Sequence, residues 1–269
     1  MQYDPVKRRL GVVFNSSPFL RKVFYHLLDL LLLRSWHIHR ELRAWARDKK
    51  DQELAIYDAG AGFGQYTYWL SGLSRKWRIT AIDVKEEQVA DCNAFFQRIA
   101  RPNVTFEVGD VTRFQRPDTF ALVVCVDVME HIVEDEAALR CYSNSLVQGG
   151  MLIISTPSDQ GGSDVHEEGE GSFIEEHVRD GYNLQDIEAK CLRNGFSRVK
   201  ARYSYGAPGR ISWKLSMKWP LLMLQASKIF FIVLPFYYLI TYPIAFVLNA
   251  MDVRMEHRTG TGLIVKAWK

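Results

Sequence analysis

The middle of the chain alternates short β-rich runs with segments of helical composition, and this alternation restricts the fold more than any other feature. The β-rich runs are 54–60, 77–83, 103–110, 120–128 and 150–158. Strands separated by helices in this way are typical of a doubly wound sheet. The apolar runs at 120–126 and 151–155 indicate central strands that helices cover on both faces. The sequence therefore predicts an α/β fold.

The second half of the chain predicts three further elements. A loop at 157–172 precedes a helix whose apolar positions are Leu184, Ile187, Ala189 and Leu192. Asn194 and Gly195 end that helix, because both residues suit the backbone that follows a last helical turn. A strand at 196–205 follows, and a last strand at 260–268 closes the chain.

Composition limits the classes of protein that this chain can belong to. With 269 residues, 48% hydrophobic and 24% charged, it suits one large α/β domain or two small ones. A net charge of +3 is too small to indicate a nucleic-acid binder by itself. Cys92, Cys125, Cys141 and Cys191 include no C-x-x-C pair, so we expect neither a zinc knuckle nor a disulfide framework. We expect a reducing cytosolic compartment and identify no signal peptide.

A glycine-rich loop follows the first strand. Asp58 is followed by Gly60, Gly62 and Gly64 in the pattern D-x-G-x-G-x-G. A tight turn and a close approach of the backbone to a ligand both favour residues without Cβ, so a nucleotide-like ligand is expected here. Gln65 stands where a dinucleotide fingerprint would have its third glycine, which weakens an NAD interpretation. Taken alone, such a loop is also compatible with a purely structural turn.

Five segments together resemble the successive motifs of class I S-adenosylmethionine-dependent methyltransferases. They are "IYDAGAGFGQYTYWL", "ITAIDVKEEQV", "VTFEVGDVTRF", "ALVVCVDVMEHI" and "LVQGGMLIISTP". The resemblance covers about 53–205 and the final strand. It implies a Rossmann-like, doubly wound, seven-stranded sheet with an antiparallel last strand. The expected domains are an N-terminal helical cap (1–50), a cofactor-binding core (51–206), an apolar helical insertion between strands six and seven (207–257) and the final strand (258–269).

The same resemblance implies which residues bind S-adenosylmethionine. Asp58 would approach the amino end of the methionine moiety, and Asp83 would accept hydrogen bonds from both ribose hydroxyls. Asp110 would meet the adenine amino group, while the backbone N–H of Val111 would donate to a ring nitrogen. The full expected set is Asp58, Gly60, Gly62, Asp83, Val84, Asp110, Val111 and Asp127.

The motif "DVMEH" after the fourth strand holds the candidates for chemistry. Methyl transfer needs alignment and removal of a proton from the nucleophile, and the pKa of a phenol is about 10, so a base or a Lewis acid helps at neutral pH. The segment resembles the E-x-x-E-H of ubiquinone-type O-methyltransferases and of small-RNA 2′-O-methyltransferases. Glu130 and His131 are therefore the expected catalytic residues.

A divalent metal is a further interpretation of the same motif. The resemblance implies a ligand set of Asp127, Glu130, His131 and His177, which would suit Mn²⁺, Fe²⁺ or Co²⁺ better than Mg²⁺. Without a metal, the acid would support the substrate loop, and His131 would act as a base or cap the next helix. His177 is equally compatible with a surface position. No role is assigned to His26, His37, His39, His166 or His257.

Residues 229–248 form a stretch of twenty positions without an acid or a base. As a helix it would extend about 30 Å, enough to cross a bilayer. Strands six and seven are expected to be neighbours, so the chain has to leave and return on the same side. Pro235 and Pro243 are each expected to break a straight helix. The sequence therefore predicts a bent helical pair or a re-entrant element bound at a membrane interface.

The flanks of this stretch are basic and aromatic. The cations are Arg210, Lys214, Lys218, Arg254 and Arg258, and the aromatic residues are Trp213, Trp219, Tyr237, Tyr238 and Tyr242. Both classes are favoured at the headgroups of a membrane. The N-terminal segment, with Ser17 and Pro18 as its helix start, has the same character. As an alternative to lipid contact, the two segments would pack on each other as a lid or a dimer interface.

Together these features predict an S-adenosylmethionine-dependent O-methyltransferase of a lipophilic phenolic, quinone-type or aryl-polyene acceptor. We expect a cytoplasmic protein bound peripherally or monotopically to the inner face of the membrane, with no nucleic-acid partner. The alternatives are an RNA 2′-O-methyltransferase and a non-catalytic, membrane-associated scaffold that binds the cofactor. An NAD-dependent oxidoreductase fits least, and the oligomeric state stays open.

Overall fold

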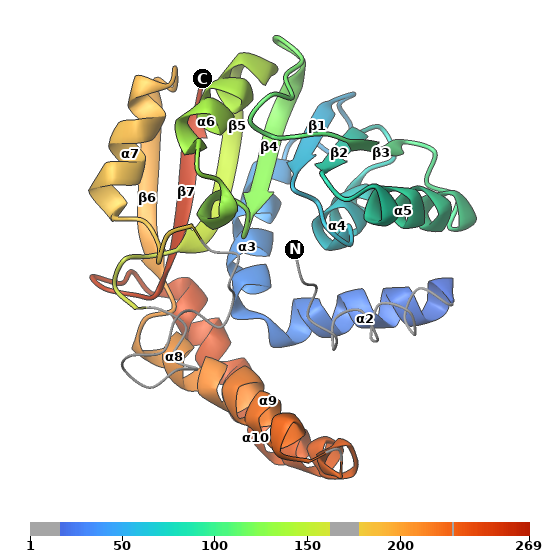
Figure 1. Ribbon diagram of the computed structural model, residues 1–269, viewed down its shortest axis with the longest axis vertical. Helices are drawn as coiled ribbons and strands as arrows, with labels where there is room; N and C mark the ends of the chain where they lie inside the picture. Colours follow the sequence, from blue (N-terminus) through green and yellow to red (C-terminus); the bar gives the residue numbers. More distant parts are fainter. Residues whose placement is uncertain (1–16, 162–177, 228) are drawn as a thin grey trace.

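The computed structural model describes residues 17–161, 178–227 and 229–269. The described residues form a seven-stranded sheet in the order β3-β2-β1-β4-β5-β7-β6. The strands are β1 (Ala55–Ala59), β2 (Arg78–Asp83), β3 (Val104–Val108), β4 (Phe120–Val126), β5 (Leu146–Pro157), β6 (Arg198–Ser204) and β7 (Gly262–Trp268). β7 runs antiparallel to both β5 and β6. The predicted Rossmann-like fold with an antiparallel last strand is confirmed (Figure 1).

Helices cover both faces of the sheet, as Figure 1 shows. The connecting helices are α4 (Gln65–Leu73), α5 (Glu86–Arg98), α6 (Asp135–Ser145) and α7 (Leu184–Arg193). Side chains of β4 alternate between two core clusters: Val123 packs with α6 and α7, whereas Leu122 packs with α4 and α5. Because both faces of β4 are buried in this way, its sequence is an unbroken apolar run. The loop expected at 157–172 lies mostly outside the described residues.

Two helices form the N-terminal cap. They are α2 (Pro18–Leu31) and α3 (Leu33–Ala46), and the Ser17 hydroxyl accepts a hydrogen bond from the N–H of Phe19 at the start of α2. Arg21 is buried and ties α2 to the loop after β1, because its Nη2 lies 3.0 Å from the carbonyl oxygen of Phe63. Its guanidinium also stacks 4.6 Å from the ring centre of Phe95 on α5. The cap is therefore fixed to the glycine-rich loop.

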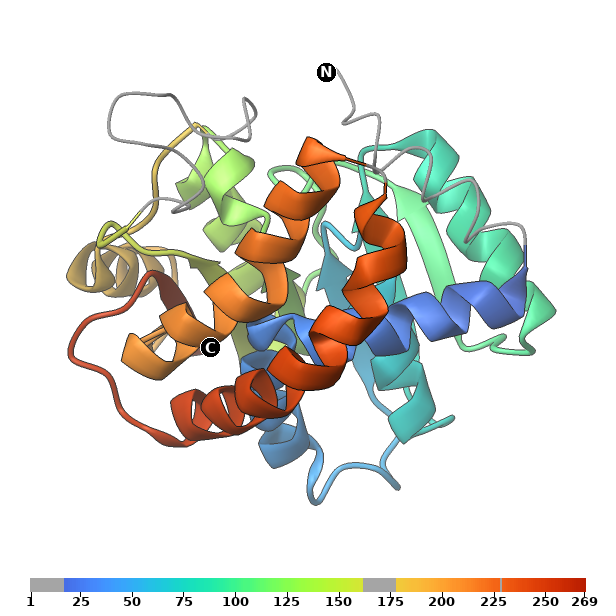
Figure 2. The same ribbon diagram turned by 90° about the horizontal axis from the view of Figure 1, so that it is seen from below.

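The apolar insertion folds as a helical hairpin, residues 207–254, in which residue 228 is not described. Its first arm contains α8 (Ala207–Trp213), the π-helical turn η2 (Lys214–Lys218) and α9 (Trp219–Ala226), and its second arm is α10 (Phe230–Arg254). Figures 1 and 2 show the two arms side by side, projecting away from the sheet. The predicted helical insertion between strands six and seven is confirmed, but residues 229–248 are not themselves a bent pair, because they lie in the single helix of the second arm and pair with the arm at 207–226.

The prediction that the prolines interrupt the helix was wrong. α10 is one continuous element with Pro235 and Pro243 inside it, although it curves along its length in Figure 2. Contacts with the first arm sustain it: the hydroxyls of Tyr237 and Tyr238 donate to the carbonyl oxygens of Leu215 and Ser216, at 2.7 and 2.8 Å. Tertiary contacts therefore outweigh the local cost of each proline.

A buried carboxylate holds the two arms of the hairpin together where α8 begins and α10 ends, which we call the root of the hairpin. Asp252 is fully buried and accepts from Nε2 of His37 at 2.9 Å and from the backbone N–H of Gly209, also at 2.9 Å. Nε2 of His257 lies 3.2 Å from the second carboxylate oxygen. Two histidines without an assigned role thus belong to one structural cluster that joins α3, α8 and α10. Sequence analysis missed it because its members are far apart in the chain.

The cap and the hairpin also touch beside this root. Trp36 packs edge-on against Phe246 with ring centres 4.9 Å apart, and the hydroxyl of Tyr242 donates to the carbonyl oxygen of Leu30. Beyond these contacts the outer face of α10 is exposed. Among the described residues, α10 alone has the length and hydropathy of a membrane-crossing helix, and 6% of its most apolar window is buried. Packing between the cap and the hairpin therefore covers the root and leaves the projecting part of the hairpin, its shaft, exposed.

Candidate cofactor and active site

The carboxyl ends of β1, β2, β3 and β4 lie at one edge of the sheet, because these strands run parallel. Asp58 on β1, Asp83 at the end of β2, Asp110 after β3 and Asp127 after β4 are therefore brought to the same edge. Doubly wound sheets bind their ligands at such an edge. The hairpin emerges there too, because β6 is antiparallel to β7 and so runs parallel to β5.

The glycine-rich loop needs its glycines for two reasons. Gly60, Gly62 and Gly64 all have positive φ angles of 69°, 52° and 79°. A Cβ on Gly60 would lie 2.4 Å from a methyl carbon of Val128, so the loop is packed tightly against the segment after β4. A Cβ on Gly62 would meet nothing within 4 Å. The loop thus presents bare backbone to open space at Gly62, as the approach of a ligand requires.

Asp83 is fixed by the backbone around it. Its two carboxylate oxygens accept hydrogen bonds from the N–H groups of Gly62, at 2.8 Å, and Lys85, at 2.9 Å. Each carboxylate oxygen can accept a second hydrogen bond, so a ligand with two neighbouring hydroxyls fits. Val84 beside it is 55% exposed, and Val108, which pairs with Asp83 across the β2–β3 ladder, is 53% exposed. A carboxylate beside open apolar surface suits a nucleoside.

The segment after β3 continues this surface. Asp110 is exposed, and its carboxylate accepts from both the backbone N–H and the hydroxyl of Thr112, at 2.8 and 2.7 Å. Val111 is buried in the core cluster that α6 and α7 cover. The carboxylate of Asp110 therefore has a fixed orientation and remains accessible to a ligand.

Asp58 is the most deeply buried of the four aspartates at this edge. Its side chain is 3% exposed and accepts a hydrogen bond from the hydroxyl of Thr67 on α4. Burial, with a smaller contribution from the charge of Asp83, raises the pKa of Asp58 to about 6. A cationic group bound nearby would favour the ionised form.

Arg34 on α3 also reaches this edge, and sequence analysis did not identify it. Its guanidinium pairs with the carboxylate of Asp127, whose φ of +52° is uncommon for a residue with a side chain. Its Nε is buried without a hydrogen-bond partner among the described residues. Its backbone N–H donates to the hydroxyl of Tyr205, 2.9 Å away. No local motif marks Arg34, because only the packing of the cap brings it to β4.

Glu130 and His131 lie on a short 3₁₀ turn, η1 (Met129–His131), directly after β4. Glu130 is 2% exposed and accepts a hydrogen bond from the hydroxyl of Thr156 on β5 at 3.1 Å. Because its carboxyl group is held away from solvent, the pKa of Glu130 is raised. His131 is half-buried and lies nearer the surface of the edge.

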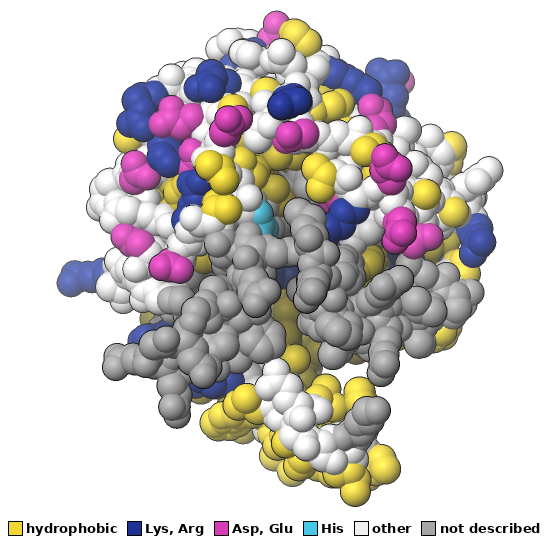
Figure 3. All heavy atoms as spheres, viewed as in Figure 1, with side chains coloured by type: hydrophobic (Ala, Val, Ile, Leu, Met, Phe, Trp, Pro, Cys, Tyr) yellow, Lys and Arg dark blue, Asp and Glu magenta, His cyan; other side chains and the backbone are white. Residues whose placement is uncertain are grey.

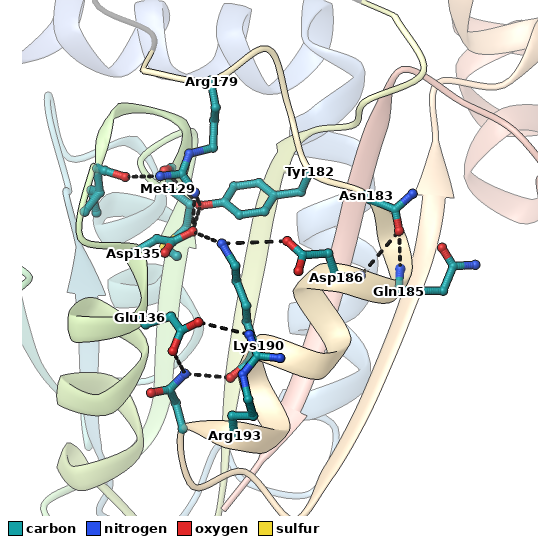
Figure 4. A network of polar contacts seen from close by, with 12 residues as sticks. Met129, Asp135, Glu136, Arg179, Tyr182, Asn183, Gln185, Asp186, Lys190 and Arg193 are labelled. Atoms are coloured by element: carbon teal, nitrogen blue, oxygen red, sulfur yellow. Dashed lines mark hydrogen bonds and ion pairs between the residues drawn. The ribbon is translucent and has the colours of Figure 1, made fainter.

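A polar network beneath η1 fixes this turn (Figure 4). Arg179 donates from Nη2 to the carbonyl oxygen of Ile132 at 2.6 Å and pairs through Nη1 with Asp135. Asp135 also receives Nζ of Lys190 at 2.7 Å and the hydroxyl of Tyr182 at 2.8 Å. Although burial opposes ionisation, these partners hold the pKa of Asp135 below its ordinary value. Asp135 therefore remains charged and ties the turn to α7.

The expected metal-ligand set is not assembled in the described part of the chain. Asp127 pairs with Arg34, whereas the carboxylate of Glu130 accepts from Thr156. Across residues 17–161, 178–227 and 229–269, no group of three or more histidine, cysteine or acidic side chains is arranged to hold a metal ion. His177, the fourth expected ligand, lies outside these residues. The side chains described here therefore do not fit the predicted metal site.

Comparison with known proteins finds similarity in the region that contains this edge. Residues 56–150 match the model of a family described as "Methyltransferase domain". The human mitochondrial ubiquinone biosynthesis O-methyltransferase is 29% identical over 107 residues, covering 38% of this chain and 28% of that protein. A malonyl-[acyl-carrier protein] O-methyltransferase of Bacillus anthracis is 27% identical over 120 residues, covering 45% of this chain and 44% of the relative. The chain thus matches less than half the length of either relative.

A solved structure extends the likeness to most of the fold. Phosphoethanolamine N-methyltransferase 2 of Haemonchus contortus, in complex with S-adenosyl-L-methionine, superposes with a TM-score of 0.61 at 16% identity. The superposition covers 91% of this chain and 60% of that one, and it shows a shared fold. Residues 56–150 therefore match a methyltransferase domain, and the region resembles curated S-adenosylmethionine-dependent methyltransferases.

Proposed function

We propose that the protein transfers a methyl group from S-adenosylmethionine to an oxygen of a lipophilic acceptor at a membrane. The acceptor class that we favour is phenolic, quinone-type or aryl-polyene. The observation that carries the proposal is the exposed apolar hairpin, which leaves the sheet at the same edge as Asp58, Asp83 and Asp127. A water-soluble acceptor would give no reason for this surface to stand beside the site.

The charges at the edge suit the methionine end of the cofactor, which carries an ammonium and a carboxylate. Arg34 and Asp127 pair with each other in the structure, and both side chains are about one-third exposed. In the proposal, the cofactor carboxylate takes the place of Asp127 at Arg34, and its ammonium is attracted to the carboxylates of Asp127 and Asp58. Asp83 and Val84 then receive the ribose and the adenine.

The sulfonium of the cofactor supplies an electrophilic methyl group, so the protein has to align the acceptor and remove its proton. His131 is the proposed base, because it lies on the turn after β4 and is not deeply buried. Glu130 is too deeply buried to meet an acceptor. We propose instead that its hydrogen bond with Thr156 and the network of Asp135 position η1, which refines the catalytic role expected for Glu130.

Methyl label followed through solvent extraction tests the acceptor class. We expect that, after incubation of the protein with methyl-labelled cofactor and a total lipid extract, label moves into the organic phase and is not released by mild protease treatment. The matched reaction with the aqueous metabolite fraction should leave the organic phase unlabelled. Label that appears only in water-soluble products or in RNA would contradict a lipophilic acceptor.

The raised pKa of Asp58 predicts a pH dependence of cofactor binding. Below a pKa of about 6 the carboxyl group is mostly neutral, so attraction of the cofactor ammonium requires release of a proton. Affinity should therefore rise with pH and level off above about 7, being about tenfold weaker near pH 5. Calorimetric titrations across this range measure the effect. Asp58→Asn should bind weakly with no such step, and an unchanged step in that variant would assign it to another group.

A further inference from the structure

The helical hairpin, residues 207–254, pairs several of its polar groups internally, although Nδ2 of Asn249 is buried without a partner among the described residues. The hydroxyl of Ser212 donates within the hairpin, lying 2.6 Å from Oδ1 of Asn249 and 3.1 Å from the carbonyl oxygen of Ala245. The hydroxyls of Tyr237 and Tyr238 bind carbonyl oxygens of η2, where the π-helical turn departs from α-helical pairing. Backbone and side-chain pairing of this kind is what an apolar surrounding demands.

The outer face of α10 is apolar and open along its length. Its most exposed side chains are Ile232 (70%), Phe236 (69%), Leu239 (75%) and Ile240 (71%). Figure 3 shows the projecting end of the hairpin covered by hydrophobic side chains, in contrast to the charged surface of the sheet domain. A continuous apolar surface of this size on a soluble domain marks a site of contact with a partner or a membrane.

Charge is separated from this surface along the hairpin. Between Lys218 and Asp252 the only charged residue in the sequence is Lys228, which lies outside the described residues. The cations near the root are Arg210, Lys214, Lys218, Arg254 and Arg258, and all of them except Lys218 are exposed. Of the two nearby acids, Asp252 is buried among its partners and Glu256 is exposed, so the cations remain in excess. An apolar shaft with a cationic root is complementary to an anionic lipid surface.

The length of uncharged chain limits how deep the hairpin can enter. The uncharged part of the first arm is α9, which has 8 residues and extends roughly 12 Å. The hydrocarbon of one leaflet is about 15 Å thick, half of a bilayer core. A full crossing would drag Lys214 and Lys218 into hydrocarbon. The first arm therefore permits entry into one leaflet only.

We propose that the hairpin inserts obliquely into one leaflet of an anionic membrane. The outer face of α10 then contacts the acyl chains, and the cations of the first arm, Arg210, Lys214 and Lys218, lie at the phosphates. The hairpin springs from the carboxyl edge of the sheet, so this orientation turns the cofactor site toward the lipid. An acceptor then reaches the site from the membrane without crossing water. This inference rests on the proposed function and names the membrane partner of the same site.

Flotation with vesicles tests the binding mode without cofactor or acceptor. The protein should float with vesicles that contain phosphatidylglycerol, and less with pure phosphatidylcholine. Raising the salt concentration should weaken binding, and Arg210→Gln should weaken it about fivefold. Phe236→Asp should abolish flotation, whereas Leu192→Asp, which changes an exposed leucine on α7, should float like the unchanged protein. Cofactor binding by each variant checks that it is folded.

Lipids brominated on their acyl chains test the depth. They should quench the fluorescence of Trp219, at the start of α9, and the quenching should be smaller in Trp219→Phe. The proposal is overturned if the protein does not float. A dimer in lipid-free buffer that Phe236→Asp dissociates would then assign the apolar face of α10 to a second copy of the chain. If the unchanged protein floats with the vesicles but transfers no methyl group to any acceptor, the proposed function is refuted, whereas the membrane-binding role of the hairpin stands.

Discussion

Replacing His131 with alanine should lower turnover by about 10² to 10⁴ fold, the usual contribution of a general base. The affinity for S-adenosylmethionine should change little, because in the proposal the cofactor is held by Asp58, Asp83, Arg34 and Asp127. Turnover is measured as labelled methyl transferred per protein, and affinity by calorimetry. Together the two readouts separate proton removal from cofactor binding.

Two variants control this result. His26→Ala removes an exposed histidine from α2 and should leave turnover unchanged. Glu130→Gln keeps the shape of the buried side chain and the hydrogen bond with Thr156 in part, so its turnover should fall less than that of His131→Ala. Full turnover in His131→Ala would refute the role of His131 as the base, and the protein would then contribute only the alignment of acceptor and cofactor.

Replacing Asp252 with alanine should lower the free energy of unfolding by about 3–5 kcal/mol, because it leaves buried partners without their acceptor. His37 and the backbone N–H groups of Gly209 and Tyr205 all lose a hydrogen bond. Urea unfolding followed by circular dichroism measures the change. Asp252→Asn, which keeps the volume of the side chain, should lie between Asp252→Ala and the unchanged protein.

The same cluster should weaken in acid. Burial holds the pKa of His37 below its ordinary value of 6.5, so the folded state resists a proton that the unfolded chain accepts. Stability is therefore lost as pH falls below about 6.5. Hydrogen bonds and charge from His37 lower the pKa of Asp252, although burial opposes ionisation, and this adds a further loss below its ordinary value of 3.8. As an exposed control for Asp252→Ala, Asp48→Ala should leave the urea midpoint unchanged. If Asp48→Ala lowered the midpoint as much as Asp252→Ala does, the stabilising role assigned to Asp252 would be refuted.

The sheet and its ligand edge followed from local patterns. Asp58 and Asp83 lie near the ends of strand patterns, and Asp110 and Asp127 lie just after them. Parallel strands bring their carboxyl ends together, so the common edge was predictable. The topology of β6 and β7 likewise required the insertion between them to return to its own side, and it does so as a hairpin whose second arm contains the apolar stretch.

The missed features depend on contacts between distant parts of the chain. His37 and Asp252 are 215 positions apart, so no spacing rule relates them. Arg34 reaches Asp127 only because the cap packs over the edge. The rule that proline breaks a helix failed at Pro235 and Pro243, because the tyrosines of α10 bind the opposite arm and sustain the helix. Tertiary structure decided each of these cases.

The cofactor is the central claim, and calorimetric titration with S-adenosylmethionine tests it most directly. We predict one binding site with a dissociation constant on the order of micromolar. S-adenosylhomocysteine should compete for it, NAD should not, and Arg34→Ala should bind more weakly. No heat of binding from the folded protein at millimolar cofactor, or binding of NAD at the same edge, would contradict the account.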